Sequence, residues 1–196
     1  SATADIIERA VANTVKFVEL AESEVNPLAV LRRALLTQKC TVVIDVGAYL
    51  AGVKVGQLAR RLLDNDEAVL QRLGLRGICF HDGEDWTVLD TQKRLMTPLK
   101  HSAIRPAQCF VVFDQMRCRG ADLVLDRNAH ALVTIGPTLT KDQFLQALGR
   151  LRLYGRNQRT TLAANSVVRA MIRSCASHDS NNNELSSPDV LDVVVW

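Results

Sequence analysis

Two segments of the chain carry the residues best suited to chemistry on phosphate groups. The first reads Arg117-Cys-Arg-Gly-Ala-Asp-Leu123 and follows an apolar run at 109–113. Ligands of α/β sheets bind where strands end, and a glycine there lets backbone amides turn toward a phosphate. We therefore predict a phosphate-facing loop containing Arg119, Gly120 and Asp122, in which the carboxylate orients an arginine or a ribose hydroxyl. An ordinary turn with a capping aspartate is the alternative.

The second segment reads Gln146-Ala-Leu-Gly-Arg-Leu-Arg-Leu-Tyr-Gly-Arg156 and follows another apolar run at 131–135. Apolar residues recur there at helical spacing, so we predict a helix over 141–154 that begins with a capping box of Thr140 and Gln143. The face of this helix that packs on the sheet is expected to hold Phe144, Leu145, Leu148 and Leu151.

The opposite face of this helix is predicted to be catalytic. Gln146 and Arg150 lie four residues apart and therefore on one face, and Gly149 beside them lets a partner approach closely. A guanidinium held on a rigid helix can stabilise charge that develops on a γ-phosphate bound by another lobe, which is the role of an arginine finger. We predict this role for Arg150, with Gln146 as a second catalytic residue. An exposed surface arginine is the alternative.

Positive charge is concentrated around these two segments. Residues 117–159 contain eight Lys or Arg and three Asp or Glu, although the whole chain has a formal net charge of only +3. Such a patch suits phosphate, whether of a nucleotide or of a nucleic-acid backbone, although an ordinary solvated basic face is the alternative.

The cysteines and histidines suggest neither a disulfide framework nor a metal site. The five cysteines are odd in number and scattered, without a Cys-x-x-Cys pair. This usage favours a reduced, intracellular protein, cytoplasmic or nuclear. The four histidines have no zinc-ligand spacing, so we predict no metal site, and no apolar run approaches transmembrane length.

Short apolar, β-branched runs alternate along the chain with helical patterns. This alternation predicts a three-layer α/β domain with a mainly parallel sheet, in which 42–46, 109–113 and 131–135 are central strands. Further strands are expected at 76–80 and 160–163, with a small hairpin over 86–99. Further helices are expected at 3–20, 27–37 (capped by Asn26), 55–63, 66–73 and 165–175.

The order of strand, Arg-Gly-x-Asp loop, strand and Gln-x-x-Gly-Arg helix resembles the C-terminal RecA-like lobe of superfamily-two helicases and translocases, a P-loop NTPase-type fold. The chain resembles most closely a family of very large eukaryotic proteins of unknown function that carry a SecA-like ATPase motif and are often labelled ubiquitinyl hydrolases. The resemblance spans roughly residues 40–165 and is carried by 43–48, 113–114, 119–123, 134–137, 141–142 and 146–152.

The resemblance implies that the chain is part of a larger protein and completes an ATP site supplied by an N-terminal ATPase lobe of the same polypeptide. ATP and Mg²⁺ are expected only with that lobe, because this sequence has no Gly-x-x-x-x-Gly-Lys-Ser/Thr loop and no Asp-Glu metal box. A second arginine usually follows the first by three residues in helicase motifs. Here that position holds Leu153, and Arg152 and Arg156 are the nearest candidates for phosphate contact.

The expected organisation is an N-terminal helical arm at 1–38, the RecA-like lobe at 39–178, and a linker with the start of a following element at 179–196. The substrate is expected to be nucleic acid or a protein, and no membrane partner is expected.

Two other functions remain open. A cysteine-type ubiquitinyl hydrolase would use Cys118, whose positive neighbours favour the reactive thiolate, with His130 or His101 as base. The sequence positions no base beside Cys118, so we expect it not to be a protease nucleophile. The third possibility is a RecA-like scaffold that only makes protein contacts.

Overall fold

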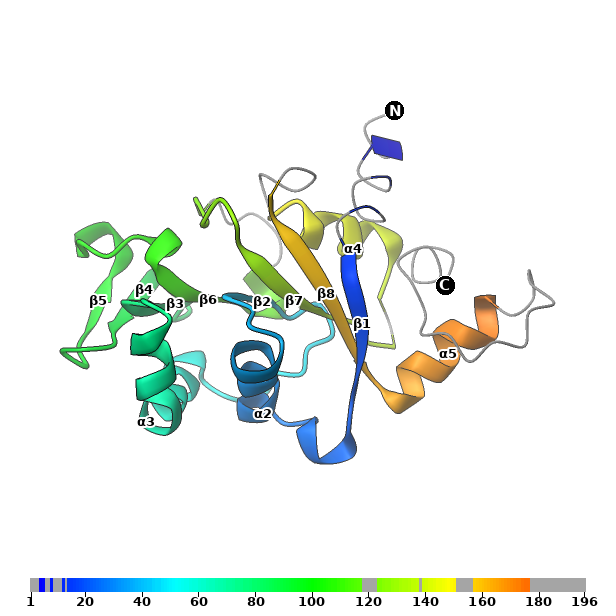
Figure 1. The fold of residues 1–196 in the computed structure, drawn as a ribbon, viewed down its shortest axis with the longest axis horizontal. Coiled ribbons are helices and arrows are strands. Elements are labelled where there is room, and N and C mark those ends of the chain that lie inside the picture. The colour runs from blue at the N-terminus through cyan, green and yellow to red at the C-terminus, as the bar shows by residue number, and fades with distance from the viewer. Residues whose placement is uncertain are drawn as a thin grey trace.

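The chain forms a three-layer α/β structure around one eight-stranded sheet (Figure 1). The computed structural model describes residues 14–117, 123–137, 139–150 and 157–176, together with Ala4, Asp5, Glu8 and Ala12. The strand order is β1-β8-β7-β2-β6-β3-β4-β5. Neighbours from β1 through β3 in this order are parallel, whereas β4 and β5 are added antiparallel at one edge.

The strand positions confirm the predicted mainly parallel sheet. The segments expected at its centre form β7, β2 and β6, which are adjacent in the sheet. The hairpin expected over 86–99 is the antiparallel pair β4 and β5. The strands are β1 (Thr14–Leu20), β2 (Val42–Ile44), β3 (Gly77–His81), β4 (Trp86–Asp90), β5 (Met96–Pro98), β6 (Cys109–Phe113), β7 (His130–Thr134) and β8 (Arg159–Asn165).

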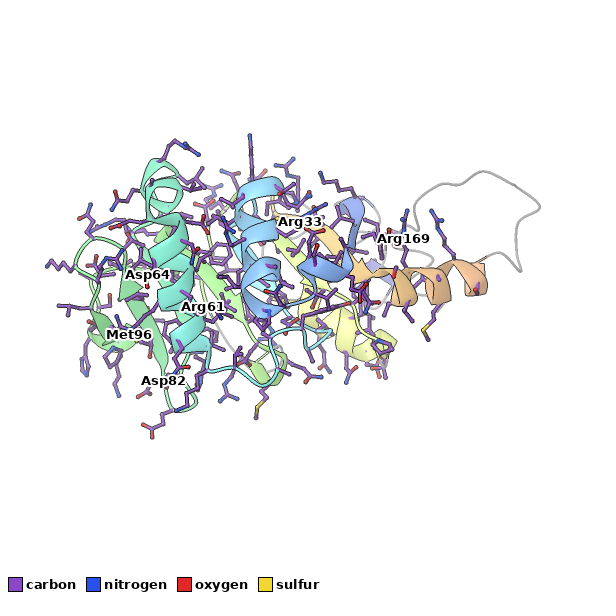
Figure 2. All side chains as sticks on the ribbon, turned by 90° about the horizontal axis from the view of Figure 1, so that it is seen from below. Arg33, Arg61, Asp64, Asp82, Met96 and Arg169 are labelled. Carbon is purple, nitrogen blue, oxygen red and sulfur yellow. The ribbon has the colours of Figure 1, made fainter. Side chains whose placement is uncertain are left out.

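The helices α2 (Pro27–Arg32) and α3 (Val55–Arg72) cover one face of the sheet, and α4 (Lys141–Leu148) and α5 (Ser166–Ala176) cover the other. Each face has its own apolar core. Leu31 and Leu62 belong to the core on the first face, and Phe144 and Ile172 to the core on the second. Figure 2 views the molecule from below and shows α2 and α3 side by side over the sheet.

Local capping signals set the starts of α2 and α4 as the sequence predicts. The Asn26 side chain accepts a hydrogen bond from the amide of Ala29 at 2.9 Å, and Pro27 occupies the first helical position, where no amide hydrogen is needed. Thr140 and Gln143 form the reciprocal capping box, with distances of 3.1 and 3.2 Å. These caps fix the points at which the chain enters each helical layer.

Three helix boundaries differ from the expectation. The prediction of a helix over 3–20 is wrong for residues 14–20, which form β1. There, parallel pairing with β8 overrides the helical spacing of the apolar residues. The two helices predicted at 55–63 and 66–73 form one helix, α3, with a kink at Asp66. The helix predicted to reach Tyr154 ends at Leu148, where the poor helix former Gly149 follows.

β1 and α2 come from the segment expected as an N-terminal arm, and both belong to the same layers as the rest of the fold. Residues 179–196 lie outside the described residues.

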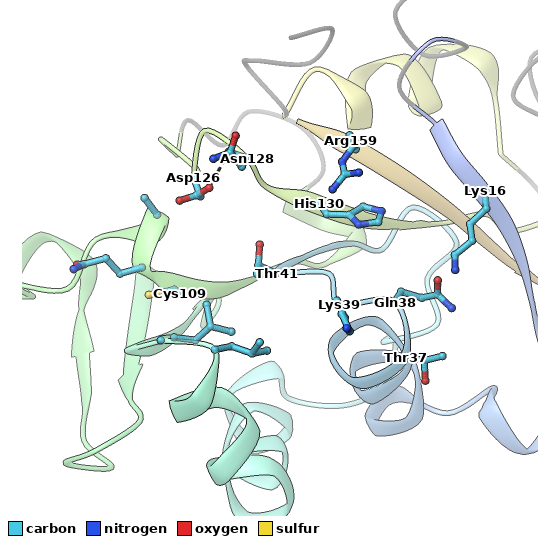
Figure 3. A pocket seen from close by; sticks show the side chains of 15 residues that line it. Lys16, Thr37, Gln38, Lys39, Thr41, Cys109, Asp126, Asn128, His130 and Arg159 are labelled. Atoms are coloured by element: carbon cyan, nitrogen blue, oxygen red, sulfur yellow. Dashed lines mark hydrogen bonds between the residues drawn. The ribbon is translucent and has the colours of Figure 1, made fainter. Parts of the chain in front are cut away.

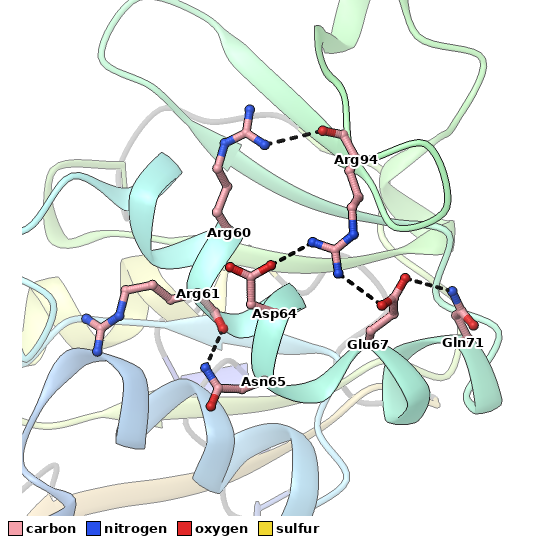
Figure 4. A network of polar contacts seen from close by, with 7 residues as sticks. All are labelled: Arg60, Arg61, Asp64, Asn65, Glu67, Gln71 and Arg94. Atoms are coloured by element: carbon pink, nitrogen blue, oxygen red, sulfur yellow. Dashed lines mark hydrogen bonds and ion pairs between the residues drawn. The ribbon is translucent and has the colours of Figure 1, made fainter.

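A surface network joins α3 to the turn between β4 and β5 (Figure 4). The Arg94 guanidinium donates to Asp64 at 2.6 Å and to Glu67 at 2.9 Å, while Arg60 donates to the Arg94 carbonyl. Because the two ion pairs are exposed to solvent, they orient the turn more than they stabilise the fold.

Candidate functional site

The carboxyl ends of the central parallel strands meet at one edge of the sheet. Ile44 of β2 pairs with Phe113 of β6 and with Val133 of β7, so the residues that follow these strands are neighbours. Asp45 follows β2 directly, and its amide donates to the Phe113 carbonyl at 2.8 Å. In parallel α/β sheets this edge is where ligands bind.

Asp45 is a buried carboxyl group at this edge. It is only 1% exposed, and the Thr134 hydroxyl at the end of β7 donates to its Oδ1 atom at 2.6 Å. The amides of Tyr49 and Leu50 donate to its two oxygens at 3.0 and 2.8 Å. Since both oxygens already accept hydrogen bonds from the protein, we assign Asp45 to ordering the 45–50 loop rather than to contacting a ligand.

The surroundings of Asp45 act on its pKa in opposite directions. Burial raises the pKa above the ordinary value and is the largest effect, while the nearby Asp114 carboxylate also raises it. The hydrogen bonds from Thr134, Leu50 and Tyr49 favour the ionised form and offset part of this rise. The carboxyl group therefore holds its proton to a higher pH than an ordinary aspartate does.

Two glycines let the loops after β2 and β7 touch. A methyl group on Gly47 would lie 2.9 Å from the backbone of Ile135 and of Gly136, and one on Gly136 would lie 3.0 Å from the Cα atom of Gly47. The Gly47 amide also donates to the Thr134 hydroxyl at 3.0 Å. Only residues without a side chain permit this approach, so the two loops form one rigid unit.

Tyr49 ties the 45–50 loop to the ends of two more strands. Its hydroxyl donates to the Ile135 carbonyl at 3.1 Å and accepts from the Asn165 amide, at the end of β8, at 3.0 Å. Burial raises the pKa of Tyr49, so its hydroxyl keeps the proton that it donates. The carboxyl ends of β2, β7 and β8 are therefore connected by hydrogen bonds.

The predicted catalytic residues lie on α4 and just after it, downstream of this unit. Gln146 is exposed on α4, whereas Phe144, Ala147 and Leu148 face the core. Arg150 is half-buried in the turn that follows α4, and its amide donates to the Ala147 carbonyl at 3.1 Å. The exposed Gly149 caps the helix.

The other predicted contacts lie outside the described residues. These are Arg119, Gly120, Asp122, Arg152 and Arg156, and Cys118 lies there too. The 118–122 segment follows the short helical turn Gln115–Arg117, in which the Arg117 amide donates to the Asp114 carboxylate at 3.0 Å. This turn follows β6 at the carboxyl edge of the sheet.

Sequence reasoning did not single out the residues that order this edge. Asp45, Gly47, Thr134 and Gly136 lie in two of the stretches that carry the helicase resemblance, but no local pattern signals that Asp45 and Thr134, 89 residues apart, contact each other. Tyr49 and Asn165 had no recognisable signal, because their roles depend on which strands become neighbours.

The two histidines considered as bases lie elsewhere. His130 begins β7 at the amino edge of the sheet, and its Nε2 atom lies 2.7 Å from the Thr161 hydroxyl. His101 ends the helical turn Leu99–His101 that follows β5. The described thiols of Cys40, Cys79 and Cys109 are buried, and burial raises the pKa of each, to about 12 for Cys40 and Cys109. These three thiols are therefore unsuited to nucleophilic catalysis.

No protein-family model matches the chain, and neither the curated proteins nor the solved structures contain a match to it. Within the described ranges, no helix is both long and apolar enough to cross a bilayer, and no three or more His, Cys, Asp or Glu side chains gather as metal ligands would. The chain is an α/β domain in which hydrogen bonds join the loops at the carboxyl ends of β2, β7 and β8 into one rigid polar unit.

Proposed function

We propose that this chain is a helicase- or translocase-like C-terminal lobe that completes an ATP site supplied by another lobe of a larger protein. The observation that carries the proposal is the joined pair of loops after β2 and β7. Two of the stretches that resemble the helicase-like family, 43–48 and 134–137, make contact through Asp45–Thr134 and Gly47–Gly136 at the edge where α/β sheets bind ligands.

This rigid unit supports the region that carries the proposed catalytic residues. The loop after β7 leads through the Thr140 cap into α4, whose apolar side is buried in the core. Gln146 therefore faces solvent from an anchored helix, and Arg150 lies in the turn after that helix. A catalytic group needs such support, because a displacement of about 1 Å lowers the rate of reaction strongly.

In this proposal the other lobe would hold ATP and Mg²⁺, and bound ATP would supply the γ-phosphoryl group that is transferred to water, with ADP as the leaving group. The Arg150 guanidinium stabilises negative charge on the γ-phosphoryl group, and Gln146 contributes a neutral amide that orients the reactants. Arg119, Arg152 and Arg156 are proposed as further phosphate contacts, with Gly120 and Asp122 shaping the loop.

Comparing ATP turnover by the 196-residue chain with turnover by a longer polypeptide that also contains the proposed ATPase lobe tests this function. We expect the isolated chain to be inactive, since its sequence contains no phosphate-binding loop and no metal-binding acid pair. We expect the longer polypeptide to hydrolyse ATP. Turnover by the isolated chain that Arg150→Ala abolishes would contradict the division of the site between two lobes.

A further inference from the structure

A pocket of about 720 Å³ opens at the amino edge of the sheet, opposite the edge proposed to face ATP (Figure 3). It lies over the starts of β8, β7, β2 and β6, and the loop after α3, with Leu73, Gly74 and Leu75, forms another wall. This volume falls in the range of sites that hold small molecules. The proposed helicase-like role assigns nothing to this pocket.

Basic side chains from four neighbouring segments line the pocket. Lys16 comes from β1, Arg159 from β8, His130 from β7 and Lys39 from the turn before β2. His130 and Arg159 are direct partners in the sheet register. The sheet order β1-β8-β7-β2 therefore sets these groups in a row across one wall.

Among the residues that the structure describes, the positive charges in this row have no carboxylate partner. Within the ranges that the structure describes, Lys16, Lys39 and Arg159 form no ion pair, and Asp126 is the single acidic residue that lines the pocket. The charges of Arg159 and Lys16 both act on His130, whose pKa is lowered by burial first and then by these two cations. Like charges held together in a concave site attract an anion.

Gln38 adds an uncharged hydrogen-bond acceptor to the pocket. It lines the pocket and is only 7% exposed, and its buried Oε1 atom has no hydrogen-bond partner among the described residues. An unsatisfied buried acceptor costs about 1–3 kcal/mol. A hydroxyl group on a ligand would satisfy it by donating to the Oε1 atom.

The backbone of Lys39 also indicates that its side chain has a role in the pocket. Lys39 adopts a φ of 55°, a left-handed conformation that glycine adopts at lower cost after a helix. The chain thus presents a cationic side chain at a position where the fold alone favours glycine.

We propose that this pocket binds a small phosphate ester that carries hydroxyl groups, of the sugar phosphate class. The phosphate lies between Arg159, Lys16 and Lys39, and a hydroxyl donates to Gln38. A single-stranded nucleic acid fits less well, because none of the described residues that line the pocket is a Phe, Tyr or Trp that could stack on bases. The proposal does not depend on ATP at the other edge.

Titrating the 196-residue chain with ribose 5-phosphate by calorimetry tests the proposal, with inorganic phosphate and ribose in parallel. We expect ribose 5-phosphate to bind, inorganic phosphate to bind more weakly and ribose not to bind. Arg159→Gln should weaken ribose 5-phosphate binding about tenfold, because it removes a charge-assisted hydrogen bond. Lys93→Gln, an exposed change in the turn between β4 and β5, is the matched control and should leave binding unchanged.

Two further variants separate binding from folding. Lys39→Gly should keep or raise the melting temperature while it weakens ribose 5-phosphate binding, since it relieves the backbone and removes the cation. Gln38→Leu should reduce the preference for ribose 5-phosphate over inorganic phosphate. Failure of ribose 5-phosphate to bind would overturn the proposal. Equal affinity for inorganic phosphate and ribose 5-phosphate would also overturn it. A single-stranded oligonucleotide that binds more tightly than ribose 5-phosphate, and still does so in the Arg159→Gln variant, would overturn it as well.

Discussion

Asp45 is a buried carboxylate whose hydrogen bonds all serve to shape the backbone around it. Its partners are the Thr134 hydroxyl and the amides of Tyr49 and Leu50. A carboxylate can accept hydrogen bonds at both of its oxygens, whereas a neutral amide in the same place accepts at only one. These hydrogen bonds hold the 45–50 loop in one conformation, next to the edge where we propose that the chain completes an ATP site.

Asp45→Ala should destabilise the chain by about 2 kcal/mol, because it leaves buried donors without a partner and removes a costly buried charge in partial compensation. Urea unfolding followed by circular dichroism measures this. Thr134→Val is the matched variant. It removes one of the three donors to Asp45 and the acceptor of the Gly47 amide, but it keeps the shape of the side chain and leaves one donor unpaired rather than three, so its effect should be smaller. A larger loss for Thr134→Val than for Asp45→Ala would show that the carboxylate is not the centre of the network.

His130 should make the stability of the chain depend on pH. Burial, and then the charges of Arg159 and Lys16, lower its pKa below the ordinary 6.5. The unfolded chain therefore takes up a proton near 6.5 that the folded chain takes up only at lower pH. The contribution of this residue to stability is complete above pH 6.5 and is lost as the pH falls through the folded-state pKa.

Unfolding experiments between about pH 7.5 and about pH 5 check this sign. His130→Gln keeps a polar partner for Thr161 and should lose less stability on acidification than the unaltered chain does. Lys39 and Asp126 also line the pocket and are common to both proteins, so the difference between the two curves isolates His130. Identical slopes would contradict the lowered pKa.

At the scale of elements, the contact between the loops after β2 and β7 depends on two glycines. A Cβ atom on Gly47 would meet the backbone of Ile135 and Gly136 at 2.9 Å and the Tyr49 ring at 2.6 Å. Backbone atoms cannot move aside as a flexible side chain can.

Gly47→Ala should therefore lower the free energy of unfolding by about 1–3 kcal/mol, as overpacking does. Gly56→Ala is the control, since a methyl group there meets Phe80 at an ordinary 3.4 Å inside α3 and should stabilise that helix by up to about 1 kcal/mol. Thermal unfolding of the two variants should shift in opposite directions. Equal behaviour would mean that the loops separate at little cost.

The elements that could be predicted from the sequence are those whose signals lie within a few neighbouring residues. Apolar β-branched runs identified β2, β6 and β7, and local capping pairs at Asn26 and Thr140 identified two helix starts, because these signals are contained within a few residues. β1 was mistaken for part of a helix because its strand state depends on β8, far away in the sequence. The contacts of Tyr49 and the pocket at the amino edge cannot be predicted for the same reason, because both form only once the strand order is set.

At the scale of the whole molecule, the sheet has two polar edges with different properties. The carboxyl edge is closed by hydrogen bonds among the ends of β2, β7 and β8, and the amino edge opens into a basic pocket. We propose that the first edge faces a nucleotide held by another lobe and that the second binds a separate phosphate ester. Changes at one edge should leave the other unaffected, since a packed sheet lies between them.

The proposed lobe function assigns the catalytic role to Arg150, and paired measurements on Arg150→Ala test it most directly. One is ATP turnover by the longer polypeptide that contains both lobes, and the other is the melting temperature of the 196-residue chain. Arg61→Ala, an exposed change on α3 across the sheet, is the control for both. We predict that Arg150→Ala lowers turnover by on the order of 10³–10⁵, while stability changes by no more than about 1 kcal/mol. Turnover that survives while the melting temperature falls by many degrees would make Arg150 a structural residue and contradict the proposed function.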